Sequence, residues 1–161
     1  MKVAIGCDGA AFQLKTLLAA HLRLQGHDVT DFGTHDNEEA AYPDIGIAVA
    51  EAVASGKHQR AVLLCGTGIG MAISANKVAG IRAAQAHDTY SAERASRSND
   101  AQIITLGARV VGAELAKAIV DRFLGFGFDG GRSRAKLALI AAYERRKETA
   151  SGPPPITSGV R

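Results

Sequence analysis

The chain has 161 residues and a mass of 16.7 kDa, and it is 47% hydrophobic and 22% charged, which is typical of one globular domain that buries a core. Its formal charge of +3 and pI of 9.0 suggest nucleic-acid binding. However, residues 1–131 carry 12 basic and 14 acidic side chains, while residues 132–161 carry 7 basic and 2 acidic. The basic character is therefore local, and with no Trp and eight Phe or Tyr we expect no nucleic-acid partner.

Three further classes of protein lack support. Cys7 and Cys65 each end an apolar run typical of a buried strand, which is not the pattern of a disulfide framework. No C-x-x-C or H-E-x-x-H spacing occurs and the five His are scattered, so no metal site is predicted. The N-terminal residues begin a strand rather than a signal peptide, and no apolar stretch reaches the ~18 residues that span a bilayer. We therefore expect a cytoplasmic protein without a membrane partner.

Short apolar runs alternate with longer amphipathic segments along the chain. Strands are predicted at Lys2–Cys7, Asp28–Asp31, Ala61–Cys65, Ile81–Ala86 and Gln102–Leu106. After the first strand, apolar residues recur at helical spacing from Phe12 to Leu22, with Gly26 as the C-terminal cap. Pro43 suits the first position of a helix that continues to about Gly56. Further helices are predicted at Gly70–Val78, Thr89–Arg97, Gly112–Phe123 and Arg132–Arg146.

This alternation predicts an open, doubly wound α/β domain whose parallel sheet is covered on both faces. Such sheets bind ligands at the carboxyl ends of their strands, near a reversal of strand order. The rule directs attention to Cys7-Asp8, Cys65-Gly66-Thr67, His87-Asp88 and the loop after Leu106. We expect the domain to cover residues 1–148, and the Pro-, Gly- and Ser-rich residues 149–161 to form a disordered tail.

The strongest local signal is the segment Cys65-Gly66-Thr67-Gly68-Ile69-Gly70, between a predicted strand and a predicted helix. Its three glycines let the backbone curl and present N–H groups to an anion, and the helix adds the positive end of its dipole. The segment is not a dinucleotide fingerprint, whose third glycine would fall on Met71, nor a Walker loop, because no Gly-Lys-Ser/Thr follows. It is interpreted as an oxyanion or phosphate cradle, with a tight strand–helix turn as the alternative.

Several side chains near this segment have both a chemical and a structural interpretation. Cys65 lies at a helix N-terminus and has two interpretations: a thiolate that acts as base or nucleophile, and a buried structural cysteine. Cys7 is not followed by a glycine-rich segment and is assigned to the core. Asp8 is either a site residue or a helix cap. Arg132 and Lys136 share one helical face, which suits a phosphate clamp or an ordinary solvated face.

Short motifs occur in a fixed order over most of the chain, from Met1 to about Arg146. They are Gly6-Cys7-Asp8, Tyr42-Pro43, Cys65–Gly70, Ser74–Lys77 with Gly80–Arg82, Tyr90–Ala92, Asn99, Gly107–Val110 and Gly130–Arg132. Together they resemble the ribose-5-phosphate isomerase B / galactose-6-phosphate isomerase family of sugar-phosphate isomerases. Several motifs in order are far more specific than any one of them.

The resemblance implies an α/β, Rossmann-like three-layer sandwich with a five-stranded parallel sheet, and a homodimer or homotetramer with interface active sites and no cofactor. It also implies interconversion of small aldose and ketose phosphates through a cis-enediolate, which needs one base and donors for the oxyanion. By position, Cys65 matches the base, and Gly66 to Gly70 match the cradle, with the Thr67 hydroxyl aimed at the substrate. Asp8 and Asn99 match the residues that contact the sugar hydroxyls. Arg109, Arg132 and Lys136 match the residues that bind the phosphate, although Lys136 replaces an arginine and so loses its bidentate fork.

Two positions depart from the ribose-phosphate members of that family. Gly9 and Ser98 stand where those enzymes have histidines, and the second histidine is the acid that opens the furanose ring. Erythrose 4-phosphate and erythrulose 4-phosphate cannot close that ring, because the oxygen on C4 carries the phosphate. A tetrulose-phosphate branch of the family shares the His87–Arg94 and Ser98-Asn99 segments. We therefore predict isomerisation of D-erythrulose 4-phosphate to D-erythrose 4-phosphate.

Three alternatives stay open at this point. One is a ribose-5-phosphate isomerase in which water or His87 replaces the missing acid. Another is a subunit of a galactose-6-phosphate isomerase, although that enzyme also acts on cyclic substrates. The third is a non-catalytic sugar-phosphate sensor, against which the retention of Cys65 beside an intact loop argues, since a sensor needs no base.

Overall fold

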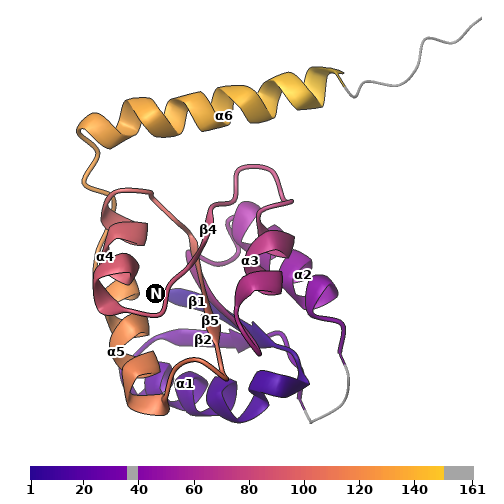
Figure 1. Cartoon of the computed structure of the whole chain (residues 1–161), viewed down its shortest axis with the longest axis vertical. Helices are drawn as coiled ribbons and strands as arrows, with labels where there is room; N and C mark the ends of the chain where they lie inside the picture. Colours follow the sequence, from indigo (N-terminus) through magenta and orange to yellow (C-terminus); the bar gives the residue numbers. More distant parts are fainter. Residues whose placement is uncertain (36–39, 151–161) are drawn as a thin grey trace, which may run out of the picture. The chain divides into compact units, whose positions relative to one another are not determined.

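Five parallel strands form one sheet in the order β2-β1-β3-β5-β4 in the computed structural model, which describes residues 1–35 and 40–150 (Figure 1). The strands are β1 (Lys2–Cys7), β2 (Asp28–Asp31), β3 (Arg60–Cys65), β4 (Ala83–Gln85) and β5 (Ile103–Gly107). The helices are η1 (Gly9–Ala11), α1 (Phe12–Leu24), α2 (Tyr42–Ala54), α3 (Ile69–Ala75), α4 (Thr89–Arg97), α5 (Ala113–Leu124) and α6 (Arg132–Ala150).

Both faces of the sheet are covered by helices, which explains why the strands are almost continuously apolar. Val62 and Leu64 of β3 belong to a buried cluster with residues of α1, α4 and α5. Leu63 and Cys65 of the same strand point the other way, into a second cluster with residues of α2 and α3. Figure 1 shows α2 and α3 on one side of the sheet and α4 and α5 on the other. The predicted three-layer α/β sandwich with a five-stranded parallel sheet is therefore confirmed.

Most helix ends follow local signals in the sequence. Gly26 takes a left-handed φ of 82° just beyond the end of α1, as the cap prediction requires. Asp88 caps α4 by accepting a 2.7 Å hydrogen bond from the Ser91 N–H, and the bounds of this helix match the prediction. Pro43 lies in the first turn of α2, but the helix begins one residue earlier than predicted, at Tyr42.

The region around β4 differs from the prediction. Helix α3 ends at Ala75 rather than Val78, because the Asn76 amide pairs with the Ala83 backbone, accepting from its N–H and donating to its carbonyl at 2.8 Å each. Strand β4 begins at Ala83 rather than Ile81, because the Ile81 N–H closes a turn on the Val78 carbonyl instead of joining the sheet. A side chain that competes for backbone groups thus ends the helix, and a backbone turn delays the start of the strand.

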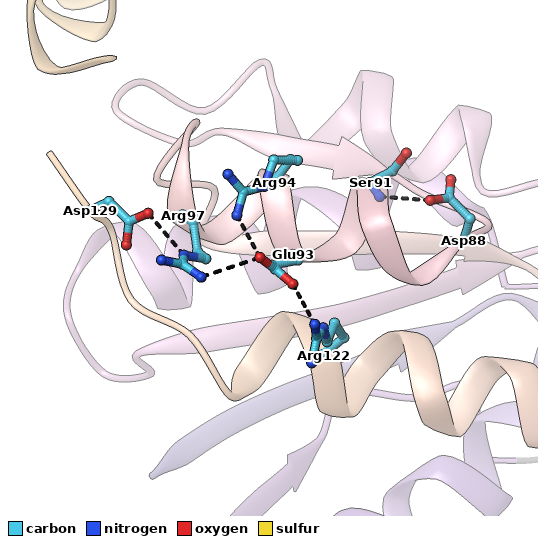
Figure 2. A network of polar contacts seen from close by, with 7 residues as sticks. All are labelled: Asp88, Ser91, Glu93, Arg94, Arg97, Arg122 and Asp129. Carbon is cyan, nitrogen blue, oxygen red and sulfur yellow. Dashed lines mark hydrogen bonds and ion pairs between the residues drawn. The ribbon is translucent and has the colours of Figure 1, made fainter. Parts of the chain in front are cut away.

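A polar network joins α4 to α5 and to the segment that follows α5 (Figure 2). The Glu93 carboxylate contacts the guanidinium groups of Arg94, Arg97 and Arg122 at 2.5, 3.3 and 2.7 Å, and Arg97 also pairs with Asp129 at 2.8 Å. Burial acts to raise the pKa of Glu93, but the hydrogen bond from Arg94 and the positive charges of Arg122, Arg94 and Arg97 hold it below its ordinary value. The carboxylate therefore stays charged and holds the three cations together.

The chain divides into two units, one from Met1 to Gly130 and one that begins at Gly131 and contains α6. Each is described here by itself. Helix α6 continues to Ala150, past the expected end of the domain at residue 148, and the rest of the expected tail, residues 151–161, lies outside the described residues. Within the described ranges, no helix has the length and apolar character needed to cross a membrane.

Candidate active site

A cavity of about 440 Å³ opens where β1 and β3 end. Because β2 and β3 lie on opposite sides of β1, the order of the strands reverses between β1 and β3, which is where sheets of this kind bind ligands. The cavity is lined by Asp8, Tyr42, Cys65, Gly66, Thr67, Ile69, Gly70 and Ile73. Of the strand ends to which the sequence directs attention, those of β1 and β3 line this cavity and those of β4 and β5 do not. Among residues 1–35 and 40–150, no group of three His, Cys, Asp or Glu side chains is arranged to hold a metal ion.

The glycine-rich loop packs directly against the end of β5. Gly68 has a left-handed φ of 81°, and a Cβ atom there would lie 2.8 Å from the carbonyl carbon of Leu106. On the facing side, a Cβ atom at Gly107 would lie 2.8 Å from the backbone of Thr67. Both positions thus require glycine, and the loop conformation depends on this close approach.

The backbone of this loop separates its acceptors from its donors. Four consecutive carbonyl oxygens are each held from the β4 and β5 side: Cys65 O by Ala108 N–H (2.9 Å), Gly66 O by Arg109 N–H (3.0 Å), Thr67 O by Gln85 Nε2 (2.7 Å) and Gly68 O by Thr105 Oγ1 (2.9 Å). In the described part of the chain, the N–H groups of Gly66, Thr67 and Gly70 have no acceptor, and these residues line the cavity. Unpaired donors beside a cavity are what an anion cradle needs.

Only one of the two thiols reaches the cavity. Cys65 is 5% exposed, and its Sγ accepts a 3.0 Å hydrogen bond from the Gly68 N–H, which stabilises negative charge on the sulfur. Cys7 is fully buried on the opposite face of the sheet, and burial raises the pKa of its thiol to about 11, against the opposing effect of the Lys15 charge. The assignment of Cys7 to the core is confirmed.

Asp8 contributes a carboxyl group to the same cavity. It holds the N-cap position of η1, as the helix-cap interpretation expects, but its side chain makes no cap hydrogen bond. Its Oδ1 atom is buried and has no hydrogen-bond partner among the described residues. Burial raises the pKa of Asp8 above its ordinary value, while the N–H groups of Ala10 and Ala11 and the Arg109 charge act in the opposite direction. The carboxyl group is thus available to a ligand.

Two lining residues were not singled out from the sequence as site residues. The ring of Tyr42 lies against Gly70, where a Cβ atom would be 2.5 Å from it, so glycine makes room for the aromatic ring. Ile73 lies one helical turn after Ile69, and the two are 56% and 51% exposed. An isoleucine inside the glycine-rich loop and a second one four residues later are a signal that the sequence contains. Nothing in the local sequence shows the contact between Tyr42 and Gly70.

The remaining predicted residues fall into three groups. Arg109 lies against Gly66, with its Cδ 3.7 Å from where a Cβ would be, and its charge acts on Asp8. Asn99 follows α4, its carbonyl accepts a 3.1 Å hydrogen bond from Arg82 Nε, and it does not line the cavity. Arg132 and Lys136 lie in α6, in the second unit. The phosphate and hydroxyl roles given to these four residues stay predictions.

The segment at residues 87–94, in which the resemblance to a tetrulose-phosphate branch was found, lies outside the cavity lining. His87 Nε2 accepts a 3.0 Å hydrogen bond from the Gly107 N–H and so ties the chain after β4 to the end of β5. Asp88 caps α4, and Glu93 and Arg94 belong to the polar network of that helix (Figure 2). None of these residues lines the cavity. Their visible roles are structural, so the segment says little by itself about the substrate.

A parallel α/β sheet with a thiol, a carboxyl group and unpaired backbone N–H groups at its reversal point suits an enzyme that moves protons beside a developing negative charge. Residues 3–140 match the model of the Ribose/Galactose Isomerase family, and the chain belongs to this family.

Several relatives resemble the chain over almost its whole length. It is 52% identical over 149 residues to the D-erythrulose-4-phosphate isomerase of Pectobacterium atrosepticum, covering 92% of this chain and 98% of that protein. It is 50% identical over 146 residues to Ribose-5-P isomerase B of Listeria innocua, covering 91% and 99%. The structure of Clostridium thermocellum ribose-5-phosphate isomerase B matches with a TM-score of 0.90 and 47% identity, covering 91% of this chain and 99% of that one. The chain is therefore a sugar-phosphate aldose–ketose isomerase.

Proposed function

We propose that this enzyme interconverts D-erythrulose 4-phosphate and D-erythrose 4-phosphate, with Cys65 as the base. The observation that carries the proposal is that Gly9 and Ser98 occupy the two positions at which the ribose-phosphate members have histidines, one of which opens the sugar ring. Gly9 and Ser98 offer no group that gives up a proton near neutral pH. A tetrose phosphate needs no such group, because it cannot close the furanose ring.

The bonding of His87 also supports an open-chain substrate. This histidine was the substitute acid that would have preserved ring opening. Its Nε2 accepts the Gly107 N–H, so the lone pair of that nitrogen is in use and it carries no proton to donate. His87 also lies outside the residues that line the cavity. Both facts argue against His87 as a ring-opening acid.

The proposed chemistry assigns one step to each group in the cavity. The Cys65 thiolate removes a proton from C1 of the ketose, the C–H electron pair forms the C1–C2 double bond, and the charge moves onto the C2 oxygen. The N–H groups of Gly66, Thr67 and Gly70 stabilise this oxyanion. The thiol then returns the proton to C2, and the hydroxyl proton passes from the C1 oxygen to the C2 oxygen, leaving an aldehyde. Asp8 contacts the substrate hydroxyls.

A side-by-side assay tests the substrate. D-erythrulose 4-phosphate, the L-erythrulose phosphates and ribose 5-phosphate are offered to the same preparation, and kcat/KM is measured for each. We expect the highest value for D-erythrulose 4-phosphate. Because a relative named Ribose-5-P isomerase B is almost as similar as the one named for erythrulose 4-phosphate, ribose 5-phosphate is the competitor that matters. If it has the highest kcat/KM, the tetrose assignment is wrong.

Restoring the two histidines tests the ring-opening argument separately. The backbone at Gly9 is not left-handed, so Gly9→His introduces no backbone strain, and Ser98 is only half-buried at the end of α4. The double variant Gly9→His with Ser98→His is expected to gain at least about tenfold in kcat/KM for ribose 5-phosphate. Ser98→Ala, which adds no acid, is the matched control and should gain nothing.

We further propose that a second copy of the chain completes each site. In the described residues, the cavity lining contains a carboxyl group and no basic side chain, although a phosphate group requires cations. Tyr42, Ile69 and Ile73 are exposed at this cavity, which suits an apolar contact with another subunit. The resemblance gives the phosphate to Arg109, Arg132 and Lys136. Arg109 lies beside Gly66 of the same chain without lining the cavity, and we propose that the second copy supplies Arg132 and Lys136.

Mixing two inactive variants tests this arrangement. Cys65→Ser removes the base from one subunit, and Arg132→Ala removes a cation from the other. If each site combines both subunits of a dimer, a random mixture should recover about a quarter of the wild-type sites. Light scattering measures the oligomeric state in parallel. A mixture that stays as inactive as its components would contradict the shared site.

A further inference from the structure

Two carbonyl oxygens of the glycine-rich loop, those of Thr67 and Gly68, are held by side chains that do not line the cavity. Gln85 Nε2, at the end of edge strand β4, donates to the Thr67 carbonyl over 2.7 Å. Thr105 Oγ1, fully buried in β5, donates to the Gly68 carbonyl over 2.9 Å. Neither residue contacts the cavity, so neither touches the substrate there.

The planarity of the peptide group gives these two bonds a consequence. In a trans peptide the carbonyl of one residue and the N–H of the next point in opposite directions. Holding the Thr67 carbonyl toward Gln85 therefore turns the Gly68 N–H away from Gln85, and this N–H points at Cys65 Sγ, 3.0 Å away. Holding the Gly68 carbonyl toward Thr105 turns the Ile69 N–H toward Thr67 Oγ1, 3.3 Å away.

We propose that Gln85 is a positioning residue for Cys65: by holding the Thr67 carbonyl, it aims the Gly68 N–H at the sulfur and so stabilises the thiolate. The Gly68 position makes this control necessary. Gly68 has a left-handed φ of 81°, and glycine has the widest conformational freedom of any residue. A contact with a neighbouring residue therefore has to fix the direction of the Gly68 N–H. Gln85 is exposed and lies on an edge strand, so it can be replaced without opening the core.

The variant Gln85→Leu tests the proposal, since leucine keeps most of the bulk and removes the donor. The readout is the rate of alkylation of Cys65 by iodoacetamide over a pH series, followed by mass spectrometry of the Cys65 peptide. A hydrogen bond to a charged group contributes enough to change the thiolate fraction about tenfold. We therefore expect alkylation near neutral pH to slow by about tenfold and its pH midpoint to rise. Turnover should fall in parallel, with KM changed less than about twofold.

Gln25→Leu is the matched control, because Gln25 is also an exposed glutamine whose Nε2 donates a hydrogen bond, here to Asp121 over 3.0 Å. It should leave both the alkylation midpoint and turnover unchanged. A folded Gln85→Leu protein whose Cys65 alkylates at the wild-type rate and midpoint overturns the proposal, as does an equal shift in Gln25→Leu.

The inference rests on the proposed role of Cys65 as the base, and the two fail in different ways. If Cys65→Ser keeps wild-type turnover, the base assignment is wrong. The alkylation midpoint of Gln85→Leu still reports whether Gln85 acts on the sulfur.

Discussion

Cys7 and Cys65 end neighbouring parallel strands and face opposite sides of the sheet. Cys7 is opposite Leu64 in the register of β1 and β3, so Cys65 lies one residue farther along and its side chain points to the other face. Cys7 packs into the cluster beneath α1 and α5, whereas Cys65 lines the cavity. The two thiols of one chain therefore have different environments that single substitutions can separate.

Replacing Cys65 should remove most of the activity. Cys65→Ser keeps the size and polarity of the side chain but is a far weaker base, so kcat should fall by about 10³. Binding of inorganic phosphate, measured by calorimetry, should stay within about twofold of wild type, because the basic residues proposed to hold the phosphate are unchanged. The control is Cys7→Ala, which should lower the free energy of unfolding by about 1 kcal/mol and leave kcat nearly unchanged. Wild-type activity in Cys65→Ser would mean that another group is the base.

Asp8 should make the stability of the protein depend on pH. Because burial raises the pKa of its carboxyl group, the native state binds this proton more tightly than the unfolded state. The contribution of Asp8 to the free energy of unfolding is therefore most favourable below the ordinary pKa of aspartate, and it is lost as the pH rises through the raised pKa.

Asp8→Asn tests that dependence. The variant should be more stable than wild type above this pH window and should lose the advantage below it, while its turnover falls because a site carboxyl is gone. Urea unfolding at a series of pH values measures the difference. A stability difference that is the same at every pH would contradict the assignment.

Gly68 should be far less tolerant of substitution than another glycine with the same backbone angle. Gly68→Ala combines a left-handed φ of 81° with a Cβ 2.8 Å from the Leu106 carbonyl carbon, so the free energy of unfolding should fall by about 3 kcal/mol. Gly26→Ala has nearly the same φ, 82°, but its Cβ would meet nothing within 4 Å, so the loss should be about 1 kcal/mol. Denaturant unfolding of both variants separates the close approach from the backbone angle. Equal losses would show that the contact with β5 contributes nothing.

Lys15 should contribute to stability through its buried charge. It is 1% exposed, and its Nζ donates to both Asp31 oxygens at 2.9 and 2.7 Å and to the Thr34 carbonyl at 2.7 Å. Lys15→Met leaves these acceptors without their donor and should lower the free energy of unfolding by about 3 kcal/mol. Lys117→Met, which breaks an exposed pair with Glu114, should cost less than about 1 kcal/mol. A similar small effect in both variants would mean that the buried pair gives no net stability.

Sequence reasoning succeeded where the signal is local. The apolar runs place β1 and β2 at their observed bounds, and the polar residues at the strand ends identify Asp8 and Cys65. The same reasoning failed near β4, where the amide of Asn76 competes for backbone groups that a periodicity argument assigns to helix and strand. That competition depends on two segments meeting in space, which the pattern of either one does not contain.

Some features of the candidate site could likewise be predicted from the sequence, and others could not. The glycines of the cradle are visible as a motif, but the packing of Tyr42 on Gly70 depends on how α2 passes α3. Gln85 has no sequence signal at all, because its contact with the Thr67 carbonyl requires the β3-β5-β4 strand order. The sequence predicts a parallel sheet of five strands, but not their order.

The donors that the glycine-rich loop leaves unpaired beside the cavity are backbone groups, and this affects how the enzyme can change its substrate. An N–H group belongs to every residue except proline, so side-chain replacements do not alter the cradle's chemistry as long as its backbone path is kept. New substrates must therefore be gained at side chains outside the loop, such as Gly9 and Ser98, where the resemblance places histidines in the ribose-phosphate members. An engineer who wants a longer or cyclic sugar should leave residues 65–70 alone and diversify those two positions.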